Sequence, residues 1–409
     1  MYNYHADIVW AVNAVLLGML IVTSAVIFAC VAVKDWLWRA RGRALANIKR
    51  DVYEMVLAGK TSSEAVCQSF TSTITPQQFI DIATNRSIDA AFFNDSEQQL
   101  LKSCFVNPVE VVRFEKIAMR SKNKWRRIEA ILCLGYIQTP DAIRILKNSL
   151  SSRDDDTSYF SMVSLGQIKK AESARVLIDF LKKYPSAGYK IVSILESFPK
   201  DIFDDIIKLT EYHDSIVRMW AVKLLSKFSA GRNISKIEKL THDVSDEVRA
   251  AACDCLGAIG NKEARPTLLK CLKDDSWRVR QHAVLALSKL IGDAAILEVI
   301  KLINDPSWVV VDAVRDVMTE HIEAALPYIE GFLDGEYEVA KKYSVLALEN
   351  SGYLLRLLKD AVSADDNGFA IRLLRGVMRS RSHAGLDAAL GNLDPASRDK
   401  ILALLVKVE

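Results

Sequence analysis

Charged side chains of both signs recur at a fixed interval in the second half of this 409-residue chain. Acidic and basic residues each repeat every 31 positions, and the two series are Asp243, Asp274 and Asp305, and Arg218, Arg249 and Arg280. Carboxylates and guanidinium groups could bind a polar ligand, or they could pair with each other across neighbouring structural units. Because the interval is constant, the second interpretation is favoured: the aspartate caps a helix and the arginine pairs with the neighbouring repeat.

The sequence has no arrangement of residues typical of an active site or a metal site. Its six histidines are His5, His213, His242, His282, His321 and His383. None lies at metal-ligand spacing from a Cys, Asp or Glu, and no phosphate loop or nucleophile elbow is found. Cys253 and Cys255 lack the spacing of a redox or zinc motif, which favours reduced, buried thiols. We therefore predict that the protein is not an enzyme and takes no cofactor, metal or small-molecule substrate.

Another group of basic residues lies near the C-terminus. Arg372, Arg375 and Arg379 fall on one face of a predicted helix, where they could bind an acidic partner or a phosphate-bearing ligand. An ordinary solvated helix face is the alternative. The net charge of +3 is small for a chain of this length, so nucleic acid is not a predicted partner.

The elements that must position these residues are helices. Apolar residues share the 31-residue interval, namely Val217, Val248, Val279 and Val310; Ala221, Ala252 and Ala283; and Leu225, Leu256 and Leu287. Within the repeat 274–305, apolar residues recur at three- and four-residue steps along two segments, which predicts a helical hairpin. One hairpin cannot bury its own apolar surface, so stacked neighbours are needed. The predicted fold is all-α, a right-handed α-solenoid with one N-terminal transmembrane helix.

The repeats resemble the HEAT-like family in its short, phycobilin-lyase-type version. The residues that carry the resemblance are Asp-Asp-Ser-Trp-Arg-Val-Arg-Gln-His-Ala-Val-Leu-Ala-Leu at 274–287 and Glu-Val-Arg-Ala-Ala-Ala-Cys-Asp-Cys-Leu-Gly-Ala-Ile-Gly at 247–260. The resemblance implies stacked helical hairpins. It also implies a scaffold most often, and in a few members a lyase subunit or a nucleic-acid-binding protein.

The N-terminal segment predicts a membrane anchor. Residues 8–33 contain no charged side chain, and this run exceeds the roughly 20 apolar residues that a span needs. Trp10 precedes the core of the run, and Trp36 and Trp38 follow it, where interfacial aromatic residues belong. A cleaved signal peptide or a lipoprotein at Cys30 is the disfavoured alternative, because no Lys or Arg comes before position 34.

Two sets of residues in and beside this segment could make contacts. Small residues form a stripe that would let another membrane helix approach closely, and they are Ala11, Ala14, Gly18, Ala25, Ala29 and Ala32. Basic residues that could bind anionic lipid headgroups follow the segment, and they are Lys34, Arg39, Arg41, Arg43, Lys49 and Arg50. Since these charges occur on one side only, the positive-inside rule places the N-terminus outside and the repeats in the cytoplasm.

These features predict four segments. Residues 1–33 are a short outer terminus and membrane helix, 34–60 a basic juxtamembrane helix, 61–120 an atypical helical cap, and 121–409 the repeats. We expect a non-catalytic scaffold in a cell membrane, such as a bacterial inner membrane. It would bind a protein partner, for example an integral-membrane enzyme such as a polysaccharide synthase. The alternatives are a lyase-type or other enzyme subunit built on HEAT-like repeats, and a nucleic-acid-binding HEAT protein.

Overall fold

A computed structural model describes residues 108–228, 234–363, 368–380, 384–391 and 393–406. Every regular element in these ranges is a helix, and no strand occurs among them, so the predicted all-α class is confirmed. The chain divides into two compact units, Met1–Val176 and Leu177–Glu409. Their boundary falls within helix α9 (Ala171–Lys183).

The described part of the first unit consists of antiparallel helical hairpins. Its helices are α5 (Pro108–Arg120), α6 (Lys124–Ile137), α7 (Pro140–Leu150), α8 (Asp155–Ile168) and the start of α9. The α6 helix packs against α5, α7 and α8. Asn123 caps α6 by accepting hydrogen bonds from the backbone N–H groups of Trp125 and Arg126. Thr139 caps α7, and Pro140 occupies the first turn, where its missing N–H is not needed.

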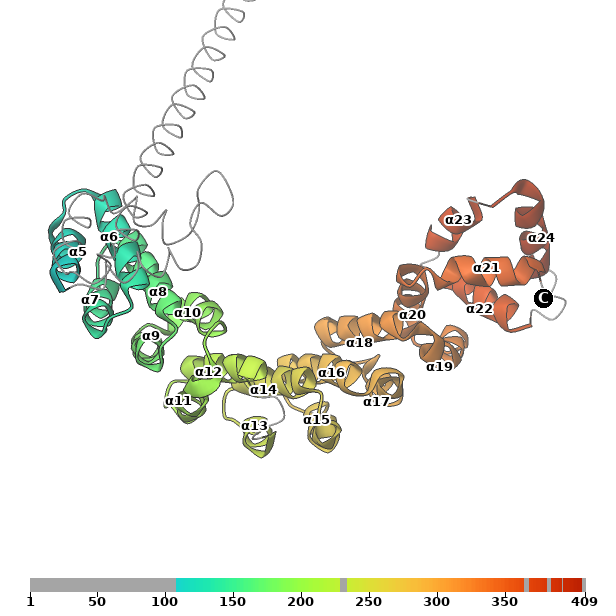
Figure 1. Ribbon diagram of the computed structural model, residues 1–409. Helices are drawn as coiled ribbons and strands as arrows, with labels where there is room; N and C mark the ends of the chain where they lie inside the picture. Colours follow the sequence, from blue (N-terminus) through green and yellow to red (C-terminus); the bar gives the residue numbers. More distant parts are fainter. Residues whose placement is uncertain (1–107, 229–233, 364–367, 381–383, 392, 407–409) are drawn as a thin grey trace, which may run out of the picture. The chain divides into compact units, whose positions relative to one another are not determined.

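The second unit continues the hairpin pattern. Its first part contains η1 (Pro185–Ala187), α10 (Gly188–Leu195), η2 (Lys200–Ile202), α11 (Phe203–Leu209), α12 (Ser215–Phe228), α13 (Ile234–Leu240), α14 (Asp246–Ile259), η3 (Lys262–Ala264) and α15 (Arg265–Cys271). Its later part contains α16 (Trp277–Ile291), η4 (Gly292–Ala295), α17 (Ile296–Val299), η5 (Ile300–Leu302), α18 (Trp308–Glu320), α19 (Ile322–Asp334), α20 (Glu338–Asn350), α21 (Tyr353–Ser363), α22 (Gly368–Arg379), α23 (Ala384–Gly391) and α24 (Pro395–Val406). The longer helices α12, α14, α16, α18 and α20 each pack on the next (Figure 1).

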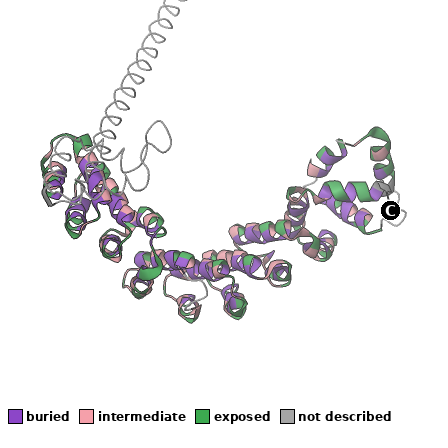
Figure 2. Ribbon diagram, viewed as in Figure 1, coloured by how far each residue is buried: buried purple, intermediate pink, exposed green. Residues whose placement is uncertain are grey.

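The core of the second unit contains the apolar residues that recur every 31 positions. The valines of this series are fully buried, and so are its alanines: Val217, Val248, Val279 and Val310, and Ala221, Ala252 and Ala283. Figure 2 shows buried residues running along α12, α14, α16 and α18 on the sides where these helices meet their neighbours. The predicted repeat register is therefore confirmed at every valine of the series. The handedness of the predicted solenoid stays a prediction.

A glycine lets two of these helices approach closely. A Cβ atom on Gly257 of α14 would lie 2.8 Å from the Ala286 Cα of α16, which is too close for any side chain. Gly135 of α6 has the same role in the first unit, because its Cβ would lie 3.0 Å from the Ser164 Cα of α8. The contact is made by backbone on both sides, so a rotamer change cannot relieve it.

Replacing Gly257 with alanine is expected to lower the free energy of unfolding by about 1–3 kcal/mol, because it overpacks the contact between α14 and α16. Gly331→Ala is the control. It adds the same methyl group inside α19, where nothing lies within 4 Å, and should stabilise that helix by about 1 kcal/mol. Urea unfolding of the full chain, followed by circular dichroism, compares the two. Equal midpoints for the variants would contradict the close approach.

Among the residues that the structure describes, no helix is both long and apolar enough to cross a membrane. The predicted membrane helix, its stripe of small residues and the basic cluster that follows it all lie outside the described residues.

Candidate partner-binding surface

The two charged series of the second unit form a ladder of ion pairs, and Arg249 shows its geometry. Its Nε and Nη2 atoms donate to the two carboxylate oxygens of Asp274 at 2.9 and 2.8 Å. Its Nη1 atom donates to the backbone carbonyls of Asp243 at 2.9 Å and Val244 at 3.3 Å. One guanidinium group thus ties the turn before its own helix to the turn before the next helix.

The same arrangement repeats one hairpin earlier and one hairpin later. Arg218 pairs with Asp243, and Arg280 pairs with Asp305, with two bonds of 2.8 Å in each case. Each aspartate also accepts the backbone N–H of the serine two residues ahead at 2.9 Å, which shapes the turn into the following helix. Because the pairs are mostly buried and fully engaged, the ladder holds repeats together, as the constant interval indicated. It leaves no charge for a ligand.

The ladder shifts the protonation equilibria of its members. Burial alone would raise the pKa of Asp274, but hydrogen bonds from Arg249 and from the backbone N–H of Ser276 outweigh it, and the pKa lies below its ordinary value. The pKa of Asp243 is lowered in the same way, against its own desolvation, by Arg218 and the Ser245 N–H. Both carboxylates are therefore ionised at neutral pH.

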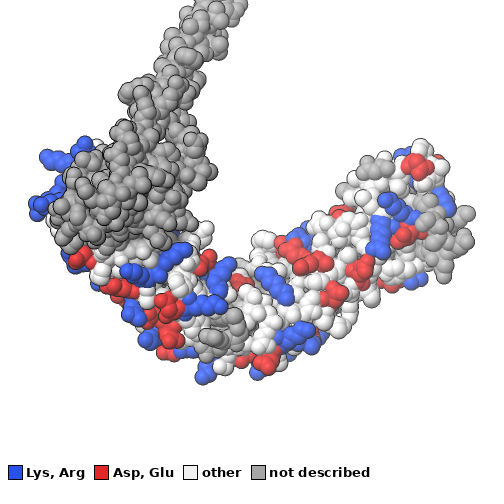
Figure 3. Space-filling view, viewed as in Figure 1, with Lys and Arg blue, Asp and Glu red and all other residues white. Residues whose placement is uncertain are grey.

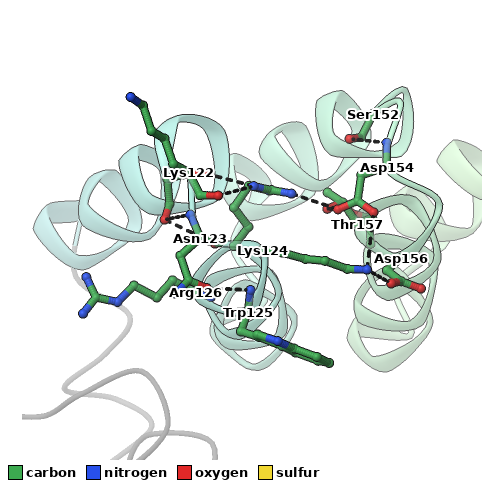
Figure 4. A network of polar contacts seen from close by, with 12 residues as sticks. Lys122, Asn123, Lys124, Trp125, Arg126, Ser152, Asp154, Asp156 and Thr157 are labelled. Atoms are coloured by element: carbon green, nitrogen blue, oxygen red, sulfur yellow. Dashed lines mark hydrogen bonds and ion pairs between the residues drawn. The ribbon is translucent and has the colours of Figure 1, made fainter.

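The first unit contains a related ion pair, between Arg127 and Asp154, that the 31-residue interval does not reveal. Arg127 donates to Asp154 at 2.9 Å and to the Ser121 carbonyl at 3.0 Å, over a separation of 27 residues rather than 25. Lys124 reaches toward Asp154 and forms an ion pair with Asp156 (Figure 4). Thr157 donates its hydroxyl to Asp154 at 2.6 Å. This side-chain network links α6 to the start of α8.

The three arginines predicted to form a basic face all lie on α22. Arg372 pairs with Glu330 at 2.5 Å, and Arg379 lies 3.9 Å from Asp334. Both carboxylates belong to α19, which packs against α22. Arg372 and Arg379 are exposed, whereas Arg375 is half-buried. The acidic groups of α19 offset part of the positive charge, so the face is less basic than its sequence suggests.

A serine at the end of α16, a histidine between α18 and α19, and an aspartate after α16 are linked in the order of a hydrolase triad. The Ser288 Oγ lies 3.0 Å from His321 Nε2, and His321 Nδ1 lies 2.8 Å from Asp293 Oδ1. Four observations weaken a catalytic interpretation. Ser288 is buried and also donates to Glu320, and Asp293 is exposed. Ser288 lies in the last turn of α16, where the helix dipole opposes a developing oxyanion. We interpret the group as a link between hairpins, and the absence of catalysis stays a prediction.

Two of the described cysteines are buried thiols with no sign of reactivity. Cys133 and Cys255 are buried free thiols, as expected. Burial raises the pKa of Cys255 to about 12 and that of Cys133 well above its ordinary value, so neither is a thiolate at neutral pH. No group of three or more metal-ligating side chains occurs among the described residues.

A row of exposed aromatic side chains is the feature that sequence reasoning missed. Trp277 is the first residue of α16 and Trp308 the first of α18, and Tyr337 is the N-cap of α20. These side chains are 41%, 70% and 68% exposed. They occupy nearly equivalent positions on three helices that pack in succession. We call these three residues the aromatic edge.

Exposed aliphatic side chains lie near the aromatic edge, one in the repeat before Trp277 and one beside Tyr337. Val244, in the turn before α14, and Val339, in the first turn of α20, are exposed. Arg278 lies over the Trp277 ring at 5.6 Å and also pairs with Asp246 and Glu247 of α14. Single exposed apolar residues are ordinary, but an aligned series of them on one edge indicates an interaction surface. Tryptophan, tyrosine and arginine are also the residue types that contribute most to protein interfaces.

The fold and this surface define a class: a repeat protein of stacked helical hairpins with an exposed aromatic edge. Residues 111–196 and 234–319 match the family model described as HEAT repeats. These two stretches therefore carry HEAT repeats, as the resemblance in the sequence predicted.

Solved structures with helical repeats also align with the chain. Human deoxyhypusine hydroxylase in complex with glycerol is 15% identical, over 60% of this chain and 96% of that one, with a TM-score of 0.27. The CpcE–CpcF complex of phycocyanin lyase from Nostoc sp. PCC7120 is 16% identical, over 62% and 95%, with a TM-score of 0.24. The karyopherin Kap121p bound to the SUMO protease Ulp1p is 16% identical, over 87% and 46%, with a TM-score of 0.43. No curated protein matches the chain. Likeness at this level assigns neither an activity nor a partner.

Proposed function

We propose that this protein is a non-catalytic scaffold that binds a protein partner through the aromatic edge of its second unit. The observation that carries the proposal is the alignment of Trp277, Trp308 and Tyr337 on three successive helices. The ladder arginines and aspartates are occupied within the repeats, and we interpret the Ser288 group as a link between hairpins. Recognition by exposed apolar and aromatic surface is then the function that the described residues support best.

The scaffold role also rests on the N-terminal sequence. The uncharged run 8–33, with basic residues only after it, supports a single membrane helix with the repeats on the cytoplasmic side. A tethered repeat domain meets membrane-bound partners at a raised effective concentration. The proposed partner is therefore an integral-membrane protein, for example an enzyme complex such as a polysaccharide synthase. The stripe of small residues would contact it in the bilayer, and the basic cluster would bind anionic lipid headgroups.

The described surface gives little support to the alternatives. On the face that Figure 3 shows, acidic and basic side chains are interspersed over the described residues, and neither sign forms a continuous stripe. Nucleic-acid binding usually requires such a basic stripe. A lyase or other enzyme subunit would need a reactive group in a suitable environment, and the burial of Ser288 and the exposure of Asp293 do not favour the Ser288 group for that role.

Exchanging Trp277 and Trp308 together for alanine should abolish most partner capture. The tagged full chain is purified gently from membranes, and the proteins that accompany it in stoichiometric amount are identified. Losing two interface tryptophans typically costs about 2 kcal/mol or more each, so recovery should fall at least tenfold. The control is Trp125→Ala with Tyr189→Ala, which removes two exposed aromatic residues that are not part of the aromatic edge.

Two results would contradict the proposal. Full recovery of the partner by the Trp277/Trp308 variant would exclude the aromatic edge as the binding surface. If a topology reporter fused to the C-terminus shows that this end lies outside the cytoplasm, the proposed cytoplasmic position of the repeats is excluded.

A further inference from the structure

We propose that the aromatic edge binds an arginine- or lysine-rich extended segment of the partner protein. This inference rests on the proposed scaffold function and names the chemistry of the partner. It is carried by the charges that surround the aromatic rings and by the interval between those rings.

Acidic residues outnumber basic ones in the turns and first helical turns around Trp277 (the start of α14 included) and Tyr337, whereas the turn before Trp308 has no charged residue outside the ladder. The acidic residues outside the ladder in these turns are Asp246, Glu247, Asp275, Asp334, Glu336 and Glu338. The basic residues before and at the start of α16 are Lys273 and Arg278. In the first turn of α20, Lys341 pairs with Glu338, and Arg379 of α22 lies near Asp334. The carboxylates of Asp275 and Glu336 form no ion pair with another described residue, and both side chains are exposed. They remain available to a cation from outside.

These carboxylates are close in sequence to the rings. Asp275 lies two residues before Trp277, and Glu336 directly precedes Tyr337. A cation placed over an aromatic face is attracted by the ring quadrupole, and a neighbouring carboxylate adds to that attraction. The protein already contains this contact internally, since Arg278 lies over Trp277 while pairing with Asp246. An incoming arginine or lysine would repeat this chemistry at Tyr337, and at Trp277 it would use the face of the ring that Arg278 leaves open.

The interval between repeats sets the spacing of the partner's cations. Helices that pack side by side lie about 8–10 Å apart, so equivalent residues on α16 and α18 are separated by about that distance. A chain in the polyproline II conformation advances about 3.1 Å per residue with three residues per turn, so every third side chain lies on the same side. A segment that crosses the repeats would therefore present a basic residue to successive rings when its cations are about three positions apart.

Acidic ligands fit this surface poorly. Nucleic acid and anionic headgroups would meet the carboxylates of the turns, and the ladder arginines that could offset them already bind Asp243, Asp274 and Asp305. The charge of the edge thus selects a cationic occupant.

The test uses the full chain in detergent micelles and two fluorescent peptides of identical composition. In one, Arg-Ser-Gly is repeated four times, so that an arginine occurs at every third position. In the other, the four arginines are contiguous. Fluorescence anisotropy should show that the spaced peptide binds more tightly and that binding weakens as salt is raised.

Four variants locate the site. Trp277→Ala with Trp308→Ala should weaken binding of the spaced peptide by about fivefold or more, as expected for two lost cation–π contacts. Asp275→Asn with Glu336→Gln should weaken it by a similar factor and reduce its salt dependence. The control pair Trp125→Ala with Tyr189→Ala should leave the affinity unchanged. A fourth variant, Leu297→Ala, removes an exposed apolar side chain of α17 and should also be neutral.

Each contrary result overturns the inference in an identifiable way. No binding of the spaced peptide, or equal loss in the edge and control variants, means that the edge does not recognise cations. Tighter binding of a peptide with the sequence of residues 34–50 would make this chain's own basic segment the occupant instead of a partner. If the Trp277/Trp308 variant loses the membrane partner but the wild-type protein does not bind the cationic peptides, the scaffold function is retained. Only the proposal that the ligand is cationic is then excluded.

Discussion

Val279→Asp should lower the stability of the second unit more than any other single substitution considered for this chain. Val279 is fully buried in α16, in the column shared with Val248 and Val310. An aspartate there would be an unpaired carboxylate among aliphatic side chains, or a protonated acid without a hydrogen-bond partner. Either form costs several kcal/mol. Because each repeat is stabilised chiefly by its neighbours, the loss should extend to the α14 and α18 hairpins.

The measurement is urea unfolding of the full chain, followed by helical circular dichroism. The matched control is Val244→Asp, which makes the same substitution at an exposed valine in the turn before α14 and should change the midpoint little. Val279→Ala separates lost packing from the buried charge, since truncation alone should cost about 1–3 kcal/mol. A Val279→Asp midpoint equal to that of Val244→Asp would mean that the column does not face the core.

Burial along the longer helices could be predicted from sequence because it depends on periodicity alone. A valine that recurs at every thirty-first position is buried each time only if every repeat packs it against the equivalent surface of the adjacent repeat. The ladder could be predicted for the same reason, since Asp274 and Arg249 keep their spacing wherever the hairpin keeps its length. Where hairpin length changes, as between Arg127 and Asp154, the interval changes and the pair is found only in the structure.

The second helix of the repeat 274–305 shows the limit of periodicity. Its apolar steps predicted one continuous helix, but the structure divides the segment into η4, α17 and η5. Both helix types place residues three or four apart on one side, so the pattern of buried residues survives the change in hydrogen bonding.

The aromatic edge could not be read from the sequence because exposure is a property of the turn and its neighbours. Trp277 follows a polar turn and begins an amphipathic helix, which is compatible with either a buried or an exposed ring. The structure decides this: Trp277 is exposed, whereas Val279, two positions later and therefore on the opposite side of α16, is buried. The carboxylates that pair with the predicted basic face of α22 could not be read from the sequence for a similar reason, since the acids of α19 that pair with Arg372 and Arg379 are distant in sequence. Partner binding by this face stays a prediction.

Asp274→Ala should be the second most damaging substitution, with a loss of about 3 kcal/mol in the free energy of unfolding at neutral pH. It removes both carboxylate bonds from Arg249 and leaves that mostly buried guanidinium without its counterion. It also removes the hydrogen bond that the Ser276 N–H donates in the turn before α16. The neighbouring Asp275→Ala is the control, because it deletes an exposed carboxylate that forms no ion pair with a described residue and should cost less than about 0.5 kcal/mol.

The two variants should also differ in their response to pH. The pKa of Asp274 is lower in the folded protein than the value of about 3.9 for an unfolded aspartate. Its contribution to stability is therefore fully present above that unfolded value and is lost as the pH falls through the folded pKa. Urea midpoints measured from pH 7 to pH 3 should show the gap between wild type and Asp274→Ala constant down to about pH 5 and narrowing below pH 4. The gap between wild type and Asp275→Ala should stay small throughout. A gap for Asp274→Ala that persisted unchanged at pH 3 would show that the loss comes from packing or turn geometry, and that the charge of the ladder contributes little to holding the repeats together.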